Sequence, residues 1–161
     1  MCLTACVRNN PLFRKVAQAE DRKRAKAADE AIAKSPALQE LDHLCTKEIP
    51  LFEGFVPNGR FASPPQKTAL HYYYRSSATY SVVKSFYVNY FSQHEWTLAR
   101  QKENSWGPDE LEFSKRPYRI IISHGGLGDA DYAMDCDKLS DSGEPLPNKS
   151  LDASGGSVFR N

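Results

Sequence analysis

The sequence predicts an α+β protein, in which one amphipathic helix packs on a sheet of antiparallel strands as a two-layer sandwich. The first observation is the helical spacing of large apolar residues between positions 78 and 96, at Val83, Phe86, Tyr87, Tyr90 and Phe91. The second is a series of short alternating runs on both sides of that helix, at 70–75, 96–103, 110–115, 118–124 and 131–139. The element order is therefore β-α-β-β-β-β, an antiparallel meander with one face against the helix.

Two further helices are expected ahead of this fold. Residues 11–34 consist mostly of strong helix formers, but their apolar content is thin, so we expect a polar helix that is solvated or lies lightly on a partner. Its basic cluster, Arg22 to Lys26, has the alternative role of contacting anionic headgroups or nucleic acid. Ser35 and Pro36 then suit the N-cap and first position of a short helix over 36–44.

The segments that flank the predicted sandwich have loop-like compositions. Residues 45–67 are rich in proline and glycine, which favours an extended approach to the fold. From residue 140 onward, serine, glycine and proline dominate and little is available to pack, so we expect a disordered tail over 140–161. One globular domain over 45–139 is consistent with a chain of 161 residues.

The first six residues, MCLTAC, contain the strongest functional signal. Leu3-Thr4-Ala5-Cys6 resembles the lipobox of bacterial lipoproteins, in which a peptidase cuts before a cysteine that carries lipid. The apolar segment of an intact signal peptide is not present ahead of it. We therefore expect residues 1–6 to be the remnant of a signal peptide, with Met1 an internal methionine, Cys6 as the lipidation site and residues 7–44 as a helical spacer. Val7 is not the aspartate that resembles an inner-membrane retention signal, which favours the periplasmic face of the outer membrane.

The remaining cysteines follow from that interpretation. If Cys2 leaves with the signal peptide and Cys6 is acylated, Cys45 and Cys136 remain as an even pair in an oxidising compartment. We expect them to form a disulfide that joins the start of the domain to its last strand. The alternative is that both are buried free thiols, as is usual in cytosolic proteins.

No motif indicates catalysis, a metal or a cofactor. Residues 125–128 contain three glycines but lie between two predicted strands, which favours a hairpin turn over a nucleotide loop. None of the four histidines has metal-ligand spacing, and His124 near Asp129 and Asp131 is interpreted as a polar flank of that turn. The net charge of +1 gives no reason to expect nucleic acid as a partner. We therefore predict that the protein is not an enzyme and needs no cofactor.

The tyrosine-rich strand suggests a candidate binding face. Side chains alternate along a strand, so Tyr72, Tyr73 and Tyr74 cannot all be buried on one side. Tyr73 exposed beside His71 and Arg75 has a composition typical of protein contact surfaces. The alternative is that these are ordinary half-buried strand residues.

The stretch from Tyr72 to Leu139 resembles small envelope lipoproteins of uncharacterised role in Gram-negative bacteria. The resemblance lies in YYYRSS, VVKSFYVNYFSQHEW and the late DYAMDC. Such proteins commonly have glycine before the tryptophan that ends the helix, where this chain has Glu95. The resemblance implies location and fold, and it implies no activity.

Together these observations predict a lipid-anchored bacterial envelope protein with a small, non-catalytic binding domain. Its expected partner is another envelope protein or a cell-wall component. Two alternatives remain open at this stage. One is a cytosolic inhibitor or immunity-type protein, and the other is a small thiol enzyme that uses Cys45 or Cys136 as its nucleophile.

Overall fold

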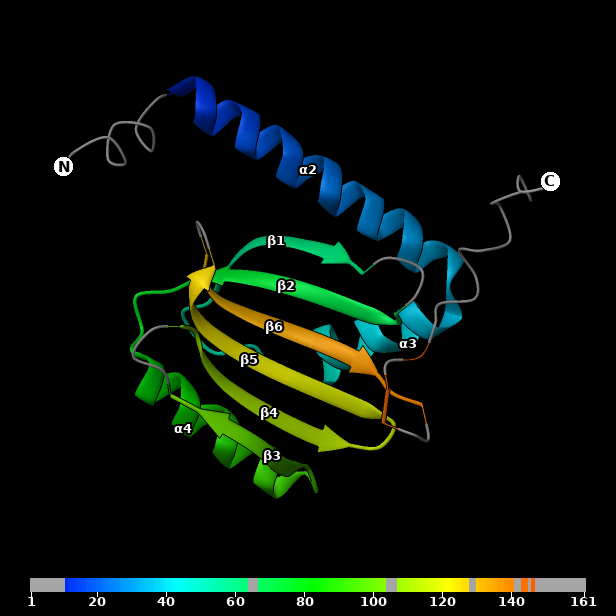
Figure 1. Ribbon diagram of the computed structural model, residues 1–161, viewed down its shortest axis with the longest axis vertical. Helices are drawn as coiled ribbons and strands as arrows, with labels where there is room; N and C mark the ends of the chain where they lie inside the picture. The colour runs from blue at the N-terminus through cyan, green and yellow to red at the C-terminus, as the bar shows by residue number, and fades with distance from the viewer. Residues whose placement is uncertain are drawn as a thin grey trace, which may run out of the picture.

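The structure is a computed structural model that describes residues 11–63, 67–103, 107–127, 130–140, 143, 144 and 146. Its helical elements are α2 (Pro11–Lys34), α3 (Pro36–His43), the short π-helix η1 (Leu44–Glu48) and α4 (Tyr80–Gln93). Its strands are β1 (Val56–Ala62), β2 (Ala69–Arg75), β3 (Thr97–Lys102), β4 (Asp109–Lys115), β5 (Tyr118–Leu127) and β6 (Ala130–Lys138). Figure 1 shows the strands as one curved sheet with α2 alongside it.

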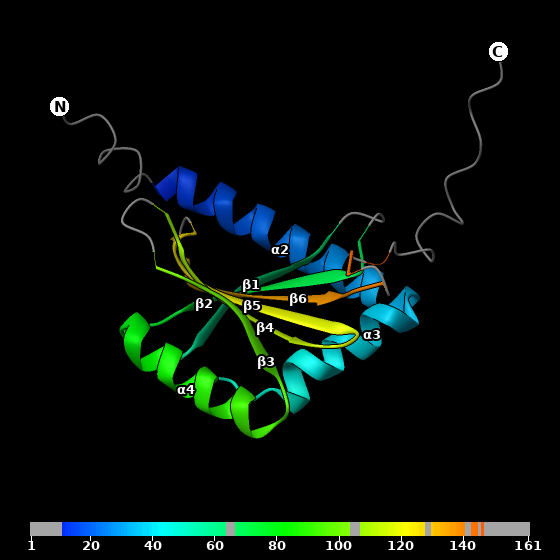
Figure 2. The same cartoon turned by 60° about the horizontal axis from the view of Figure 1, so that its bottom comes forward.

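All strands belong to one antiparallel sheet with the order β1-β2-β6-β5-β4-β3. The predicted α+β fold is therefore confirmed, with β3 to β6 as the meander and α4 as the connection from β2 to the far edge. In Figure 2, α2 lies near β1, whereas α4 lies on the other side of the sheet, below β3 and β4.

Strand β1 lies in a segment that was expected to be a loop, and this prediction was wrong. Its sequence contains Pro57 and Gly59, which are normally depleted in strands. The sheet accommodates them because β1 is an edge strand, and its register with β2 shifts between these two residues.

One face of the sheet carries the hydrophobic core. Alternation along the strands directs Leu70, Tyr72 and Tyr74 of β2 to this inner face. The helices α3 and α4 contribute to the same core. The buried residues of the two helices and of strands β4, β5 and β6 include Leu38, Leu41, Val83, Tyr87, Phe91, Leu111, Phe113, Ile120, Ile122, Tyr132 and Met134. Because Leu38 and Leu41 belong to it, the packed core includes residues that precede Cys45.

The helix starts follow the cap chemistry only in part. Ser35 caps α3 as expected, since its hydroxyl oxygen accepts a hydrogen bond from the Leu38 N–H. For α4, Thr79 occupies the N-cap position, but its side chain makes no capping hydrogen bond. Ser76 accepts from the Ala78 N–H, and its own N–H donates to Asp131 on β6.

The end of the sheet is extended by a short returning segment. Leu146 N–H donates to the Lys138 carbonyl, and the Leu146 carbonyl accepts from Thr68. These bonds lie within the region that was expected to be a disordered tail, whose residues 147–161 lie outside the described part of the chain. No helix in the described ranges is both long enough and apolar enough to cross a membrane.

Candidate functional site

The face of the sheet opposite the core is crossed by no helix in the described part of the chain, and we call it the open face. Figure 1 looks directly onto it. His71 and Tyr73 alternate with the buried Tyr72 and Tyr74, so both lie on the open face, and the exposed Arg75 follows at the end of β2. The residues expected to form a binding face therefore do share one surface.

The cross-strand registers line up a row of side chains across this face. The row begins at Phe61 on the β1 edge, continues through His71, Asp135, Ile121 and Glu112, and ends at Arg100 on the β3 edge. Acidic and basic members pair with one another within it. Arg100 contacts Glu112 at 3.2 Å, and in the adjacent row Arg119 Nε donates to Asp137 at 2.8 Å. The open face is therefore polar but nearly balanced in charge.

His71 is the centre of a hydrogen-bonded chain on this face. Its Nδ1 lies 2.7 Å from Asp135 Oδ1, and its Nε2 lies 2.7 Å from Ser63 Oγ. A carboxylate can only accept, so Nδ1 carries a proton. In the neutral ring, Nε2 then accepts a hydrogen bond from the Ser63 hydroxyl. Asp135 and Ser63 together therefore fix one tautomer of His71.

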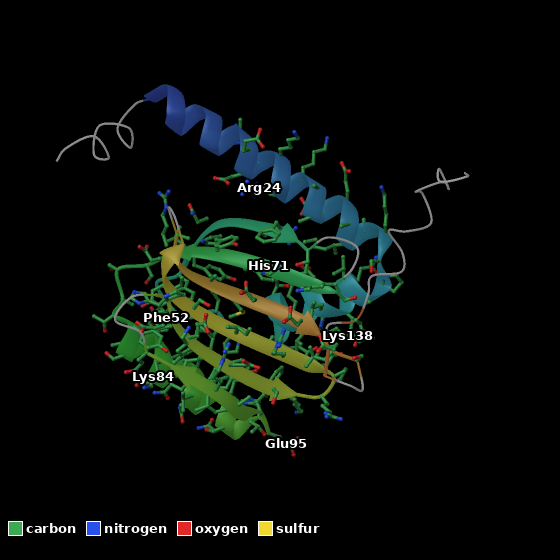
Figure 3. The ribbon with its side chains drawn as sticks, in the orientation of Figure 1. Arg24, Phe52, His71, Lys84, Glu95 and Lys138 are labelled. Atoms are coloured by element: carbon green, nitrogen blue, oxygen red, sulfur yellow. A yellow bond between two sulfur atoms is a disulfide. The ribbon has the colours of Figure 1, made fainter. Side chains whose placement is uncertain are left out.

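Aromatic contacts hold the same histidine from the side. The Phe61 ring stacks on His71 with centroids 4.2 Å apart, and it lies 5.9 Å from the Tyr73 ring. Burial raises the pKa of Tyr73, and the Asp135 carboxylate adds to that shift, while Arg24 on α2 opposes it. Figure 3 labels Arg24 on α2 and His71 on β2, with β1 running between them.

The order Ser63–His71–Asp135 is that of a hydrolase triad. Acyl transfer depends on N–H donors aimed at the developing oxyanion, and losing one such donor costs about 10²–10³-fold in rate. The Ser63 N–H is already donated to the Ala69 carbonyl, and Pro64 and Pro65, which follow in the sequence, have no N–H. The described contacts of Ser63, His71 and Asp135 are hydrogen bonds that hold the His71 ring in place.

Two hollows flank α2 where it lies along β1. The inner hollow has a volume of about 500 Å³ and faces the core side, between α2, η1 and the first two strands. The outer hollow, about 620 Å³, lies between α2 and the Phe61 side of β1, and Ser63 is part of its lining. Both volumes lie in the range of small-molecule sites, about 300–1,000 Å³.

Polar contacts connect two lining residues of the inner hollow, Arg60 and Tyr72, to the helices beside it. Arg60 on β1 pairs with Asp29 of α2 and lies 3.1 Å from Asp42 of α3. The Tyr72 hydroxyl donates to the same Asp42 oxygen at 2.8 Å. Burial raises the pKa of Tyr72, and its hydrogen bond to the Asp42 carboxylate raises it further. This cluster ties α2 and α3 to the sheet.

The structure pairs Cys45 with Cys136 in a disulfide, as the cysteine count suggested. The bond joins η1 to the central strand β6 across 91 positions of sequence, and both residues are buried. Neither cysteine is therefore a free nucleophile in this state. Cys6 lies outside the described residues, so the structure does not describe the expected lipidation site.

The second polar cluster considered from the sequence is arranged differently from what its spacing suggested. His124 Nδ1 lies 3.4 Å from Asp109 on β4, and its ring stacks on Tyr80. Asp131 instead accepts from the Ser76 N–H, and Asp129 lies outside the described residues. Within the described ranges, no group of three or more His, Cys, Asp or Glu side chains is placed to hold a metal ion.

Ser63 and Asp135 were missed from the sequence. Their contacts with His71 depend on two registers, β1 with β2 and β2 with β6, and the composition of the β1 segment predicts a loop. One signal was available, because the alternation in DYAMDCDK directs Asp135 away from the core side of Met134 and Cys136. Comparisons with protein-family models, curated proteins and solved structures return no match to this chain.

Proposed function

We propose that the protein is a lipid-anchored component of the bacterial envelope, tethered through Cys6, whose domain binds an envelope protein or a cell-wall component on its open face. The tether leads from the anchor through α2 to the sheet. The proposed location is the periplasmic face of the outer membrane. Binding, with no chemical step, is the proposed role of the domain.

The observation that carries this proposal is the Cys45–Cys136 disulfide. Disulfides persist in oxidising compartments such as the bacterial periplasm and are rare in the cytosol. The pairing thus supports the lipobox interpretation of LTAC independently of the N-terminal residues. It also argues against the thiol-enzyme alternative, since a catalytic thiolate must be free.

The open face supports the binding part of the proposal. Tyr73, His71 and Arg75 lie together on a surface without a covering helix in the described residues. Ser63 and Asp135 hold His71 in one orientation, which lowers the entropy lost when a partner binds. Tyrosine and arginine are also the residue types most enriched at protein contact surfaces.

Anchoring is tested by expressing the gene with its native upstream DNA in a Gram-negative host and feeding labelled palmitate. We expect label in the membrane-bound protein, no label in Cys6→Ser, and unchanged label in Cys2→Ser as the matched control. Label that persists in Cys6→Ser, or an unlabelled wild-type protein, would contradict the anchor.

Binding on the open face is tested with a photo-crosslinking residue at position 73 in cells, with position 85 on the exposed side of α4 as the control. We expect a discrete crosslinked species from position 73 that Arg75→Glu weakens, and none from position 85. Equal crosslinking from the two positions, or none from position 73, would contradict a binding face there.

A further inference from the structure

We propose that the inner hollow beside α2 binds the apolar chain of an anionic single-chain amphiphile, the chemistry shared by fatty acids and lysophospholipids. This inference goes beyond the proposed function, because it concerns a different surface from the open face. It also does not depend on the anchor, since every residue that carries it lies between α2 and β2.

The walls of the inner hollow are largely apolar and come from four elements. Ala25 lines it from α2 and Ile49 from the end of η1, with Pro57 on β1 and Tyr74 on β2 opposite. Burial raises the pKa of Tyr74 to about 12, which agrees with an environment that solvates charge poorly. A cavity of about 500 Å³ with such walls is suited to a flexible hydrocarbon chain.

Two exposed apolar side chains lie in or next to the lining, and we infer that the mouth of the hollow is on their side. Leu51, in its lining, is 46% exposed, and Val56, next to Pro57, is 60% exposed. These are two of the four large hydrophobic residues that are exposed in the described part of the chain. An apolar ligand that lies across the mouth removes their surface from water, which is the main source of favourable free energy in such binding.

The polar lining of the hollow does not select a polar tail. Arg60 and Tyr72, which line it, already direct their hydrogen bonds to Asp29 and Asp42. A polar group placed there would compete with bonds that are already satisfied, whereas a hydrocarbon chain leaves them intact. The apolar part of the ligand therefore points inward, and its headgroup remains at the mouth.

One side chain of α2, Arg22, favours an anionic headgroup. Arg22 lines the hollow, is exposed, and makes no ion pair within the described residues. The other charged residues of the lining are Asp21 and Arg60, and Arg60 is already paired with Asp29 and Asp42. The Arg22 guanidinium is therefore the cation of the lining that a carboxylate or phosphate headgroup can pair with.

The outer hollow provides a matched control on the same helix. Ala27 lines the outer hollow as Ala25 lines the inner one, and the two lie two positions apart on α2. Tryptophan at either position fills only its own hollow. A folding defect in both variants would be visible as a lowered melting temperature, and Leu51→Ser, at an exposed position, offers a milder change to the inner hollow.

The test uses the purified full chain carrying Cys6→Ser, so that a missing anchor does not affect the result. N-phenyl-1-naphthylamine is the fluorescent probe, and palmitate, lysophosphatidylglycerol and hexadecyltrimethylammonium compete with it below their micellar concentrations. We expect the chain to enhance probe fluorescence, with Ala25→Trp weakening binding by about tenfold or more and Leu51→Ser by less, while Ala27→Trp binds like wild type. No enhancement by wild type, or loss in Ala27→Trp but not in Ala25→Trp, would overturn the site.

The headgroup is tested with the same displacement assay. We expect both anionic amphiphiles to displace the probe better than the cationic one, and Arg22→Gln to weaken displacement by the anionic amphiphiles several-fold more than displacement by the cationic one. Palmitate alone displacing the probe would assign a free fatty acid, and lysophosphatidylglycerol alone a lipid with a glycerophosphate headgroup. Equal displacement by the cationic amphiphile would overturn the anionic assignment.

Discussion

The helices α2 and α4 cover different parts of the same sheet by different means. α4 buries Val83, Tyr87 and Phe91 completely, and the Phe91 ring stacks on Phe113 of β4 at 4.2 Å. α2 is longer by ten residues, 24 against 14, yet Ala28 is its one fully buried side chain among those described. The size of the buried side chains, and not the length of the helix, therefore determines how firmly each helix is attached to the sheet.

This difference explains where the hollows form. A helix that contacts a strand through alanine leaves space on both sides of the contact line, because its side chains are too short to reach the flanking walls. The aromatic side chains of α4 fill the equivalent space, since Phe86 contacts Phe52 and Tyr87 and Phe91 contacts Trp96. We conclude that α4 forms part of the core, while α2 is a lightly docked arm.

The largest effect on the free energy of unfolding is expected at the disulfide. This bond attaches η1, and with it the helical segment that includes α2, to the sheet. In Cys45→Ala/Cys136→Ala the unfolded chain regains the freedom of a 91-residue loop, and the free energy of unfolding should fall by about 4–5 kcal/mol. Urea denaturation of the two proteins measures this. The reduced wild-type chain serves as the control, and a difference below about 1 kcal/mol would contradict a stabilising link.

The second largest effect is expected in α4. Phe91→Ala should lower the free energy of unfolding by about 3–5 kcal/mol, because the ring is fully buried between Trp96 and Phe113. Val82→Ala is the control on the same helix, with a side chain that is 53% exposed, and should change the value by less than about 0.5 kcal/mol. Similar losses in both variants would show that α4 does not pack by this face.

A smaller effect is expected at the polar tie of α2. Arg60→Met removes the contacts with Asp29 and Asp42, and it should cost about 1 kcal/mol because the arginine side chain is 36% exposed and its ion pairs are partly screened. Amide exchange in α2 should rise in this variant while α4 is unchanged. Lys26→Ala, which loses only an exposed pair with Glu30 at 4.0 Å, is the control and should leave both helices unaffected.

The smallest effect, and one of opposite sign, is expected just after α4. Glu95 has a φ of 63°, in the left-handed region that glycine adopts at little cost. Glu95→Gly should therefore raise the free energy of unfolding by about 0.5–1 kcal/mol, since its exposed contact with Lys115 contributes little. Gln93→Gly, at the last position of α4, should instead lower it, by less than the cost of about 1 kcal/mol in a helix interior. A loss in Glu95→Gly would contradict the assignment of backbone strain to this position.

The fold was largely predictable because its strongest signals are local. The apolar spacing in α4 and the alternation in β2 and β6 depend on residues within a few positions of one another, and each was confirmed in the structure. Strand β1 was missed because Pro57 and Gly59 oppose strand formation, and only its position at the sheet edge permits it. Pairing with β2 thus outweighed local propensity.

The candidate sites were less predictable because they depend on contacts between distant segments. Asp135 lies 64 positions from His71, and the inner hollow combines residues from α2, η1, β1 and β2. The alternation along β2 was enough to place His71 and Tyr73 on one surface. It contained no information on which strand would lie beside β2, so neither Ser63 nor Asp135 was found.

Hydrogen–deuterium exchange of the native full chain, read by mass spectrometry, tests the contrast between α2 and α4 most directly. A lightly docked α2 opens locally, so its amides from residue 19 to Lys34 should exchange far faster than those of Tyr80–Gln93, which should exchange only when the whole domain unfolds. Protection of α2 equal to that of α4 would contradict the account, because it would show that the helix beside the two hollows is as firmly held as the core.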